Sequence, residues 1–166
     1  MDKLLTILTL GIIYFFIVPQ GYCRVIVQWG KFVRIAEPGL NYCWYFWGLF
    51  QKPGKQVAIS EQVRDYPNEK VYTKDGVEVL VSSVVYFTIT DPYKALFEIQ
   101  DYEEAIKSLV QSILRNECGN LTVRELFAGR KELARNLQDG LVNGVSSWGI
   151  NVRLVEIKEL EVLQKG

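Results

Sequence analysis

The chain begins with an almost unbroken hydrophobic run. Leu4–Val18 contains no charged side chain, and as an α-helix it would extend about 22 Å, against about 30 Å for the hydrocarbon core of a bilayer. Such a run suits a cleaved signal peptide, a buried helix or an uncleaved membrane anchor. Bulky Tyr22 near the exit argues against cleavage, and the lack of a polar stripe argues against a buried helix. The pattern favours an uncleaved anchor helix over residues 1–19, which either spans the bilayer or turns back at Pro19.

Basic residues beside this run indicate the orientation of the anchor. Lys3 precedes it, whereas Arg24, Lys31 and Arg34 follow it. Because basic residues concentrate in the cytoplasmic segments next to a membrane, we expect a single N-terminal anchor with the rest of the chain on the cytoplasmic face.

Alternation of apolar and polar residues predicts strands after the anchor. Residues 24–35 indicate two short strands separated by a glycine turn, and a further strand is expected over 56–67. Asp75 and Gly76 form a hairpin signal. They lead into the longest predicted strand, Val77–Thr90, in which nearly all odd-numbered residues are apolar. That strand is expected to pack on one face and to be partly covered on the other.

A helical period then replaces the alternation. Asp101 is the expected N-cap of one helix, and Thr122 with Glu125 forms a capping box for a second. Residues 130–148 show the spacing of a third helix. Alternation returns in a closing strand over residues 150–163.

The order of anchor, strands, helices and strand predicts an α+β fold in which helices pack on an antiparallel-rich sheet. A seam between two subdomains is expected at the turn before the longest strand. This divides the chain into the anchor (1–19), a first subdomain (20–73) and a second subdomain (74–166).

Composition argues against the most familiar kinds of chemistry. The chain has nineteen basic and nineteen acidic residues, so no overall field attracts nucleic acid. It contains no histidine, which removes the usual general base and the commonest zinc ligand. The standard nucleotide-binding and hydrolase motifs do not occur, and Cys23, Cys43 and Cys118 are far apart. We therefore expect no enzyme activity, no cofactor and no bound metal.

Four ordered motifs make the chain resemble the SPFH or band 7 superfamily, which includes stomatin, prohibitin, flotillin and HflK/HflC. They are VPQGYCRVIVQWGKFVRIAEPGLNY after the anchor, VYTKDGVEVLVSSVVYFTITDPYKAL across the longest strand, SLVQSILRNECGNLTVRELFAGRKEL in the helices and WGINVRLVEIKELEV at the closing strand. They cover nearly all of residues 19–163, and the closing motif is most similar to the stomatin branch.

The resemblance implies a membrane-anchored scaffold without catalysis, which forms homo-oligomers, or hetero-oligomers with another SPFH protein, and organises lateral microdomains. Its two subdomains would be the membrane-proximal and membrane-distal parts of an SPFH domain. Members of the family generally continue into a coiled coil, but this sequence ends at Gly166 without heptads, so we expect no C-terminal coiled coil. The alternative function is a regulatory adaptor that binds a membrane protease or channel. A third possibility is an enzyme with an unusual lysine or cysteine nucleophile, and a cysteine nucleophile would require a reactive thiol.

The stretch NYCWYFWGLF, residues 41–50, contains six aromatic side chains and no charge. Because tryptophan and tyrosine favour the membrane interface, we expect this loop to dip into lipid beside the anchor, where Cys23 and Cys43 would be placed for S-acylation. The alternative is an aromatic mini-core between two sheets. The expected membrane-contact residues are Leu4, Leu5, Ile7, Leu8, Leu10, Ile12, Ile13, Tyr14, Phe15, Phe16, Ile17, Val18, Tyr42, Trp44, Tyr45, Phe46, Trp47, Leu49 and Phe50.

Overall fold

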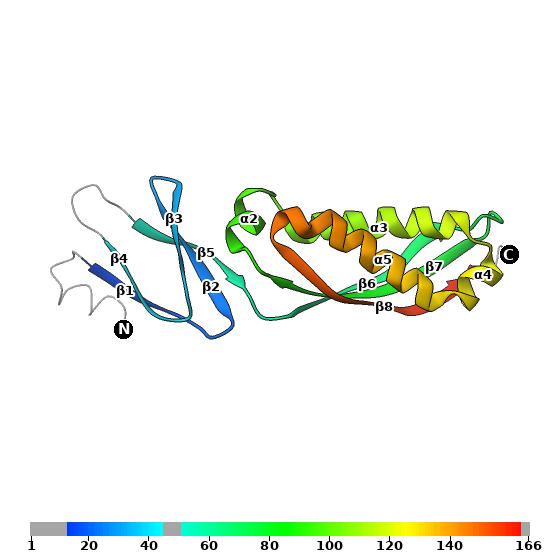
Figure 1. Ribbon diagram of the computed structural model, residues 1–166, viewed down its shortest axis with the longest axis horizontal. Helices are drawn as coiled ribbons and strands as arrows, with labels where there is room; N and C mark the ends of the chain where they lie inside the picture. Colours follow the sequence, from blue (N-terminus) through cyan, green and yellow to red (C-terminus); the bar gives the residue numbers. More distant parts are fainter. Residues whose placement is uncertain (1–12, 45–50, 164–166) are drawn as a thin grey trace. The chain divides into compact units, whose positions relative to one another are not determined.

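The computed structural model describes residues 13–44 and 51–163. It divides into two compact units, unit 1 (Met1–Ser60) and unit 2 (Glu61–Gly166), shown in Figure 1. The described residues form antiparallel sheets and helices, which confirms the α+β class. The division differs from the seam expected between residues 73 and 74, because the turn there joins two strands that pair with each other in one sheet.

Unit 1 is built from antiparallel strands in its described part. They are β1 (Ile13–Val18), β2 (Tyr22–Gln28), β3 (Lys31–Ala36), β4 (Gly39–Trp44) and β5 (Gln51–Ala58). Strands β1 and β4 form a two-stranded sheet, and β3, β2 and β5, in that order, form a three-stranded sheet. β-Branched and aromatic residues are frequent in β1 and β2, and such side chains suit a pleated surface that is packed on one side.

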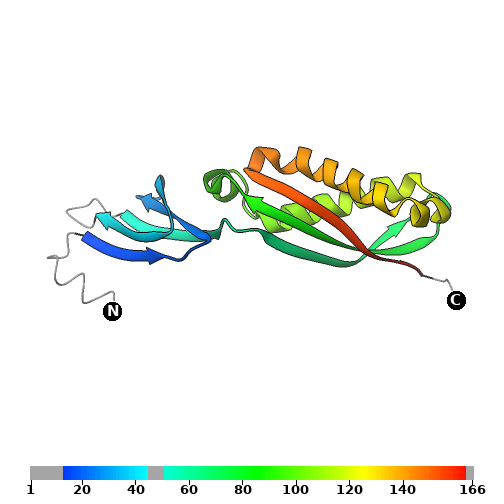
Figure 2. The same ribbon diagram turned by 60° about the horizontal axis from the view of Figure 1, so that its bottom comes forward.

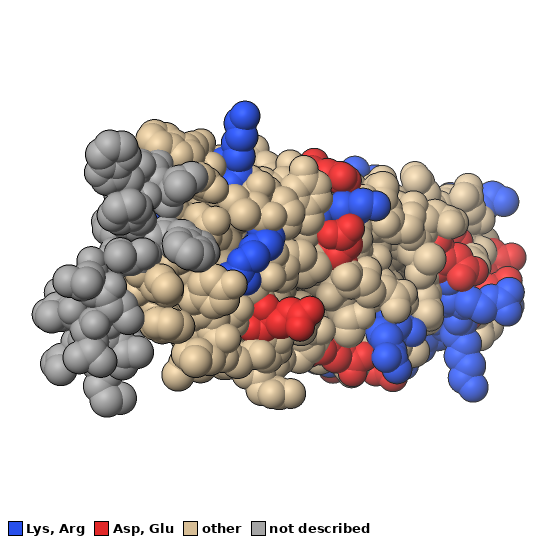
Figure 3. Space-filling view, turned by 60° about the vertical axis from the view of Figure 1, so that its left-hand side comes forward, with Lys and Arg blue, Asp and Glu red and all other residues tan. Residues whose placement is uncertain are grey.

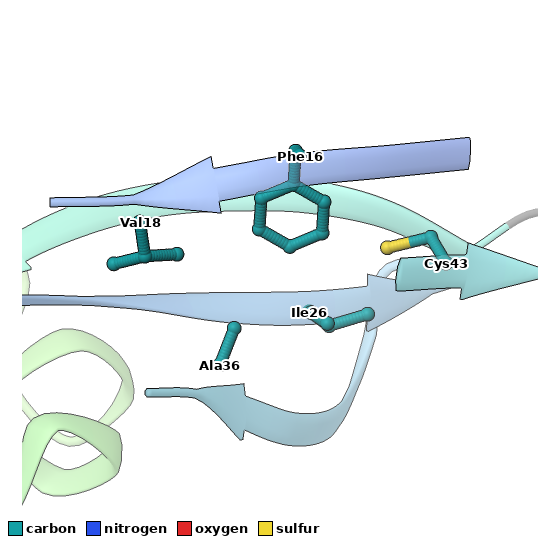
Figure 4. Packing of buried hydrophobic residues seen from close by; sticks show 5 residues of the cluster. All are labelled: Phe16, Val18, Ile26, Ala36 and Cys43. Atoms are coloured by element: carbon teal, nitrogen blue, oxygen red, sulfur yellow. The ribbon is translucent and has the colours of Figure 1, made fainter. Parts of the chain in front are cut away.

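The core of unit 1 draws residues from both of its sheets. Figure 4 shows the buried side chains of Phe16, Val18, Ile26, Ala36 and Cys43. Phe16 and Val18 are two residues apart on β1, so they point to the same face of that strand. The apolar run at the start of the chain therefore supplies part of a protein core.

The expected anchor helix is wrong over Ile13–Val18, because these residues form strand β1 and each of them pairs with a residue of β4. A continuous apolar run fits a buried helix and a buried strand equally well, and β-branched and aromatic residues favour the strand. No helix in the described part of the chain is long and apolar enough to cross a membrane. The expected anchor residues 1–12 lie outside the described residues.

Unit 2 is a three-stranded antiparallel sheet with helices packed against it. Its elements are β6 (Gln62–Tyr72), β7 (Glu78–Ile89), α2 (Pro92–Phe97), α3 (Tyr102–Asn120), α4 (Val123–Ala128), α5 (Arg130–Val145), the 3-10 helix η1 (Ser146–Trp148) and β8 (Ile150–Val162). The strand order is β6-β7-β8, and Figure 2 shows α3 and α5 over the same face of the sheet. Among the residues that the structure describes, no helix packs on the other face of the sheet.

The central strand β7 has the predicted alternation. Its odd-numbered residues from Val79 to Ile89 are all buried, whereas most even-numbered ones are partly exposed. Ser83 is the polar member of the buried row, and its hydroxyl has no hydrogen-bond partner among the described residues. The apolar residues of this row form the face of the sheet against which the helices pack.

Helices α3 and α4 begin at the expected caps. The Asp101 carboxylate accepts hydrogen bonds from the backbone N–H groups of Glu103 (3.0 Å) and Glu104 (3.3 Å). Thr122 and Glu125 form the capping box, and hydrogen bonds from the Thr122 backbone and hydroxyl lower the pKa of the Glu125 carboxyl. These bonds satisfy amide groups that a helix start leaves unpaired.

Side chains of α5 cover part of the exposed edge strand β8. Arg130 donates hydrogen bonds to the backbone carbonyls of Ile157 and Lys158. About two turns further along α5, the Gln138 amide donates to the Arg153 carbonyl (3.1 Å). Edge strands present backbone groups that pair readily with other chains, and these side chains occupy some of those groups.

Gly149 brings the start of β8 against the end of β7. Its φ is 69°, and its carbonyl accepts hydrogen bonds from the backbone N–H groups of Thr90 (2.9 Å) and Asp91 (3.0 Å). A Cβ at this position would lie 2.5 Å from Asp91 Cβ and 2.7 Å from the Asp91 carbonyl oxygen. Glycine is therefore required at position 149 for two reasons: the backbone has a positive φ, and there is no room for a Cβ beside Asp91.

We predict that Gly149→Ala lowers the free energy of unfolding of unit 2 by about 3 kcal/mol, because alanine is strained at positive φ and its methyl group overlaps the Asp91 backbone. Gly76→Ala is the matched control. Gly76 also has a positive φ, but no atom lies within 4 Å of its would-be Cβ, so a loss of about 1 kcal/mol is expected. Urea unfolding followed by circular dichroism measures both, and equal losses would contradict the close-contact explanation.

Candidate functional site

The described residues do not assemble a metal centre or an activated nucleophile. No group of three or more His, Cys, Asp or Glu side chains in residues 13–44 and 51–163 is placed to hold a metal ion. Cys23, Cys43 and Cys118 are free thiols, and all three are buried. Burial raises the pKa of each thiol, that of Cys118 to about 11, so little reactive thiolate is present at neutral pH. The distinctive surface of unit 1 is apolar.

One side of the β1–β4 sheet carries this surface. In the antiparallel register, residues 13, 15 and 17 of β1 lie opposite residues 44, 42 and 40 of β4. Alternation places their side chains on one side of the sheet and the core residues on the other. Ile17, Leu40 and Tyr42 are 73%, 71% and 49% exposed. We define the apolar face as the described side chains on this side, Ile13, Phe15, Ile17, Leu40 and Tyr42.

Exposure of the apolar face to water is unfavourable. Single exposed apolar residues are common on proteins, but neighbouring ones that form a patch mark a contact surface. Ile17 and Leu40 are direct cross-strand partners, so one apolar surface would cover both. Covering a fully exposed aliphatic side chain contributes about 1.5–3 kcal/mol, which is enough for this pair to matter in binding.

Several strand ends gather at one end of unit 1, which we call the open end. Strand β1 begins there and β4 ends there. In the other sheet, Gln28 at the end of β2 pairs with Lys31 at the start of β3 and with Gln51 at the start of β5. Trp29, in the turn between β2 and β3, has a φ of 54° and is 71% exposed. The short loops from β1 to β2 and from β3 to β4 lie at the opposite end.

Arg34 connects the two sheets beside the apolar face. Its Nη2 donates a hydrogen bond to the Tyr42 carbonyl (2.5 Å), and its guanidinium carbon lies 5.4 Å from the centre of the Tyr42 ring, within cation–π range. The half-exposed ring thus lies against a cation, an arrangement that suits a boundary between water and an apolar phase. In Figure 3, most of the described surface in the left-hand part of the view is uncharged, with a few basic and acidic side chains on it.

The structure divides the expected membrane-contact residues into three groups. Ile13, Phe15, Ile17 and Tyr42 lie in the apolar face, and Trp44 pairs with Ile13 through its backbone. Because β1 is a strand, Phe16 and Val18 lie in the core, with Tyr14 packed against it, instead of on the surface. The rest lie outside the described residues: Leu4, Leu5, Ile7, Leu8, Leu10, Ile12, Tyr45, Phe46, Trp47, Leu49 and Phe50.

Sequence reasoning does not single out two residues of this region, Leu40 and Trp29. Leu40 follows the Pro38-Gly39 turn, and the spacing of residues 40, 42 and 44 is the alternation that indicates a strand face. Trp29 precedes a turn glycine, in a position where small or polar residues are the usual ones. Both signals are short and become meaningful only once the strand pairing is known.

Comparison with known proteins gives one family and a consistent set of relatives. The SPFH domain / Band 7 family matches residues 16–165. The chain is 32% identical over 145 residues to human "Stomatin-like protein 2, mitochondrial", covering 87% of this chain and 40% of that protein. It is 35% identical over 146 residues to "Stomatin homolog PH1511" of Pyrococcus horikoshii, covering 88% and 53% respectively. The chain thus spans 40% and 53% of the lengths of these relatives.

We predict that all three thiols of the folded protein react with a maleimide roughly tenfold or more slowly than the same thiols in urea, since each is buried and has a raised pKa. Mass spectrometry after timed labelling at neutral pH measures the rate for each cysteine. Rapid labelling of any one of them in the folded chain would contradict its burial and would restore a candidate nucleophile.

Proposed function

The chain belongs to the SPFH domain / band 7 family, and from this membership we propose that it is a membrane-anchored scaffold. In this proposal it self-associates on a membrane, alone or with another SPFH protein, and organises lateral microdomains or membrane protein complexes. Its relatives are stomatin-like proteins and stomatin homologues, which supports the stomatin branch and a membrane role in general. The self-association and the partners are proposals for this chain.

The apolar face is the observation that carries the proposal. Ile17 and Leu40 form a cross-strand pair that is more than two-thirds exposed, and Tyr42 continues the same surface beside Arg34. A bilayer interface would accept the aliphatic pair in its apolar part and the tyrosine at the headgroup level. Within the described residues, the membrane contact would therefore be made by a sheet.

Two further features of the proposal concern the anchor and the orientation. The hydrophobic composition of the residues before Ile13 supports a single N-terminal anchor. The excess of basic residues that follow it supports a body on the cytoplasmic face. Strand β1 limits any anchor helix to residues that precede it, because Ile13–Val18 are paired with β4.

We propose that the chain acts without catalysis. Proteins of the SPFH family are generally scaffolds. The burial of Cys23, Cys43 and Cys118, with raised pKa values, supports this because a buried neutral thiol is a poor nucleophile. The contribution of the chain would then come from surfaces.

The helix-free face of the unit 2 sheet is the surface that we propose for contact between copies. Val63, Tyr86 and Leu154 lie opposite one another across β6, β7 and β8. Val63 and Leu154 are 50% and 44% exposed. An ion pair between Asp65 and Lys158 lies beside this row, so the surface has an apolar centre and a charged margin, as interfaces between proteins do.

The membrane contact is tested with an environment-sensitive probe. We predict that a nitrobenzoxadiazole group on Leu40→Cys in the full chain shifts its emission to shorter wavelength when phosphatidylcholine vesicles are added, because residue 40 enters the lipid interface. Brominated lipid should then quench it. The native thiols interfere little because they are buried.

Phe127→Cys with the same probe is the matched control, since Phe127 is also exposed but lies on a helix of unit 2, away from the sheet face proposed for contact between copies. It should show no shift beyond that caused by dilution. An unchanged spectrum at residue 40, with the protein bound to the vesicles, would refute contact by the apolar face and leave attachment to other residues.

Self-association is tested at the unit 2 sheet. We predict that Val63→Lys with Leu154→Glu, which keeps the net charge, weakens association in mild detergent roughly tenfold or more, because two partly exposed aliphatic side chains are lost from the interface. Light scattering coupled to size exclusion measures the mass, and negative-stain microscopy shows whether rings form.

The control for this variant is Phe127→Glu with Val142→Lys, two exposed residues on helices of the same unit, which should leave the mass unchanged. A parent protein that is monomeric and retains one other membrane protein would instead favour the alternative function, a regulatory adaptor of a membrane protease or channel.

A further inference from the structure

Three carboxylates of the unit 2 sheet are left over from its ion pairs. All four basic side chains of β6, β7 and β8 are paired with acidic residues of the same unit, as Arg64–Glu103, Lys70–Glu78, Arg153–Glu61 and Lys158–Asp65. Glu156, Glu159 and Glu161 of β8 are exposed and take part in no ion pair within residues 13–44 and 51–163. Strand β8, at the edge of the sheet, therefore carries unbalanced negative charge.

These three carboxylates form a row on the helix-free face of the sheet, which we call the acidic row. They lie opposite the alternate β7 residues Val84, Ser82 and Leu80, whose side chains point away from the helices. Successive positions on one face of a strand are about 7 Å apart. The row therefore extends along β8, and its carboxylates are not placed to converge on one metal ion.

Helix α5 carries the opposite charge beside the other face of the same strand. Hydrogen bonds from Arg130 and Gln138 to carbonyls of β8 place the helix and the strand side by side and antiparallel, as Figure 2 shows. Lys131 and Arg135 lie between these two contacts, are exposed, and form no ion pair with any described residue. Because they are four residues apart, they project from the same side of the helix. We call Arg130, Lys131 and Arg135 the basic flank.

A groove of about 610 Å³ lies between the basic flank and β8. Arg130, Lys131 and Ala134 line its α5 side, and residues 155–158 line its β8 side. The groove has room for acidic side chains of another molecule. It suits a strand of another molecule less well, because Arg130 and Gln138 already bind backbone carbonyls of this edge.

We propose that the basic flank of one copy of the chain contacts the acidic row of a second copy beside it. This inference rests on the proposed association through the helix-free face of unit 2, and it adds the surface of the second copy that meets that face. Surfaces of opposite charge on one chain make the chain complementary to another copy of itself. The contact is made by side chains and leaves the strands of each sheet unchanged.

The two surfaces lie at the same level of unit 2. Arg130 donates hydrogen bonds to the carbonyls of Ile157 and Lys158, and these two residues lie between Glu156 and Glu159 in β8. The basic flank and the acidic row are thus on the two sides of one short segment of the strand. Copies held in the same way by one membrane are related by rotation about the membrane normal, so each residue has the same height in every copy. The flank of one copy is therefore level with the row of its neighbour.

Spacing and charge favour a second copy over other partners. Lys131 and Arg135 are about 6 Å apart along the helix, close to the distance of about 7 Å between successive members of the acidic row. A nucleic acid or an acidic protein would cover the basic flank alone, and a basic protein would cover the acidic row alone. A second copy covers both surfaces with the same contact.

The test reverses the charge of each surface in the full chain. The flank variant is Lys131→Glu with Arg135→Glu, and the row variant is Glu159→Lys with Glu161→Lys. At about 0.05 M salt each should weaken association about tenfold, because attractive contacts become repulsive ones. At about 0.5 M salt the parent and both variants should differ by less than about threefold, since salt screens exposed charges. Light scattering coupled to size exclusion in mild detergent, over a series of protein concentrations, measures the association.

Rescue by exchange of charge assigns the effect to contact between the two surfaces. A chain with all four substitutions has the net charge of the parent and opposite signs on both surfaces, so it should associate within about threefold of the parent. An equal mixture of the flank and row variants should do the same.

The matched control is Lys74→Glu with Arg115→Glu, which reverses two exposed cations of unit 2 away from α5 and β8. It should change association by no more than about twofold, and adding it to the row variant should give no rescue. Circular dichroism confirms that each variant is folded.

The outcomes separate this inference from the proposal on which it rests. A parent chain that is monomeric at low salt overturns the proposed self-association together with the inference. A parent that associates while the flank variant or the row variant associates equally well overturns the inference alone. Failure of the four-substitution chain to recover, or an equal loss in the control, also overturns it, because the loss then does not come from contact between these two surfaces.

Discussion

The antiparallel ladder between β1 and β4 is the constraint from which the surface of unit 1 follows. It provides hydrogen-bond partners for the backbone N–H and C=O groups of an apolar segment. Because side chains alternate along a strand, Phe16 and Val18 point into the core and Ile17 points outward. A shift of register by one residue would exchange the two faces. The stability of the core and the chemistry of the surface therefore depend on the same pairing.

Unit 2 is organised by local signals and one close contact. Its central strand alternates regularly, its helices begin at side-chain caps, and Gly149 lets the last strand approach the end of β7. Its ion pairs lie within the unit, whereas in unit 1 Lys31, Lys52 and Lys55 are exposed to solvent. Unit 2 is thus net acidic with its ion pairs inside the unit, and the described part of unit 1 is net basic.

Strong local signals made unit 2 the predictable part of the molecule. The alternation from Val79 to Ile89, the Asp101 cap and the Thr122 capping box each have a single structural interpretation. Ile13–Val18 was expected to be helical in an anchor, but a continuous apolar run fits a buried strand equally well, and the partner strand β4 that makes it a strand is supplied only by the fold. The apolar face followed from that pairing, and the excess of basic over acidic side chains in unit 1 was hidden because charge was summed over the whole chain instead of over each unit.

The partly covered edge of β8 bears on the proposal that copies of the chain gather on a membrane. Confinement to a membrane surface makes encounters between identical chains more frequent. An edge strand with unpaired backbone groups could then pair with strands of neighbouring copies, one after another. Arg130 and Gln138 donate hydrogen bonds to backbone carbonyls of that strand, which leaves fewer carbonyls on this edge free to pair with a strand of a neighbouring copy.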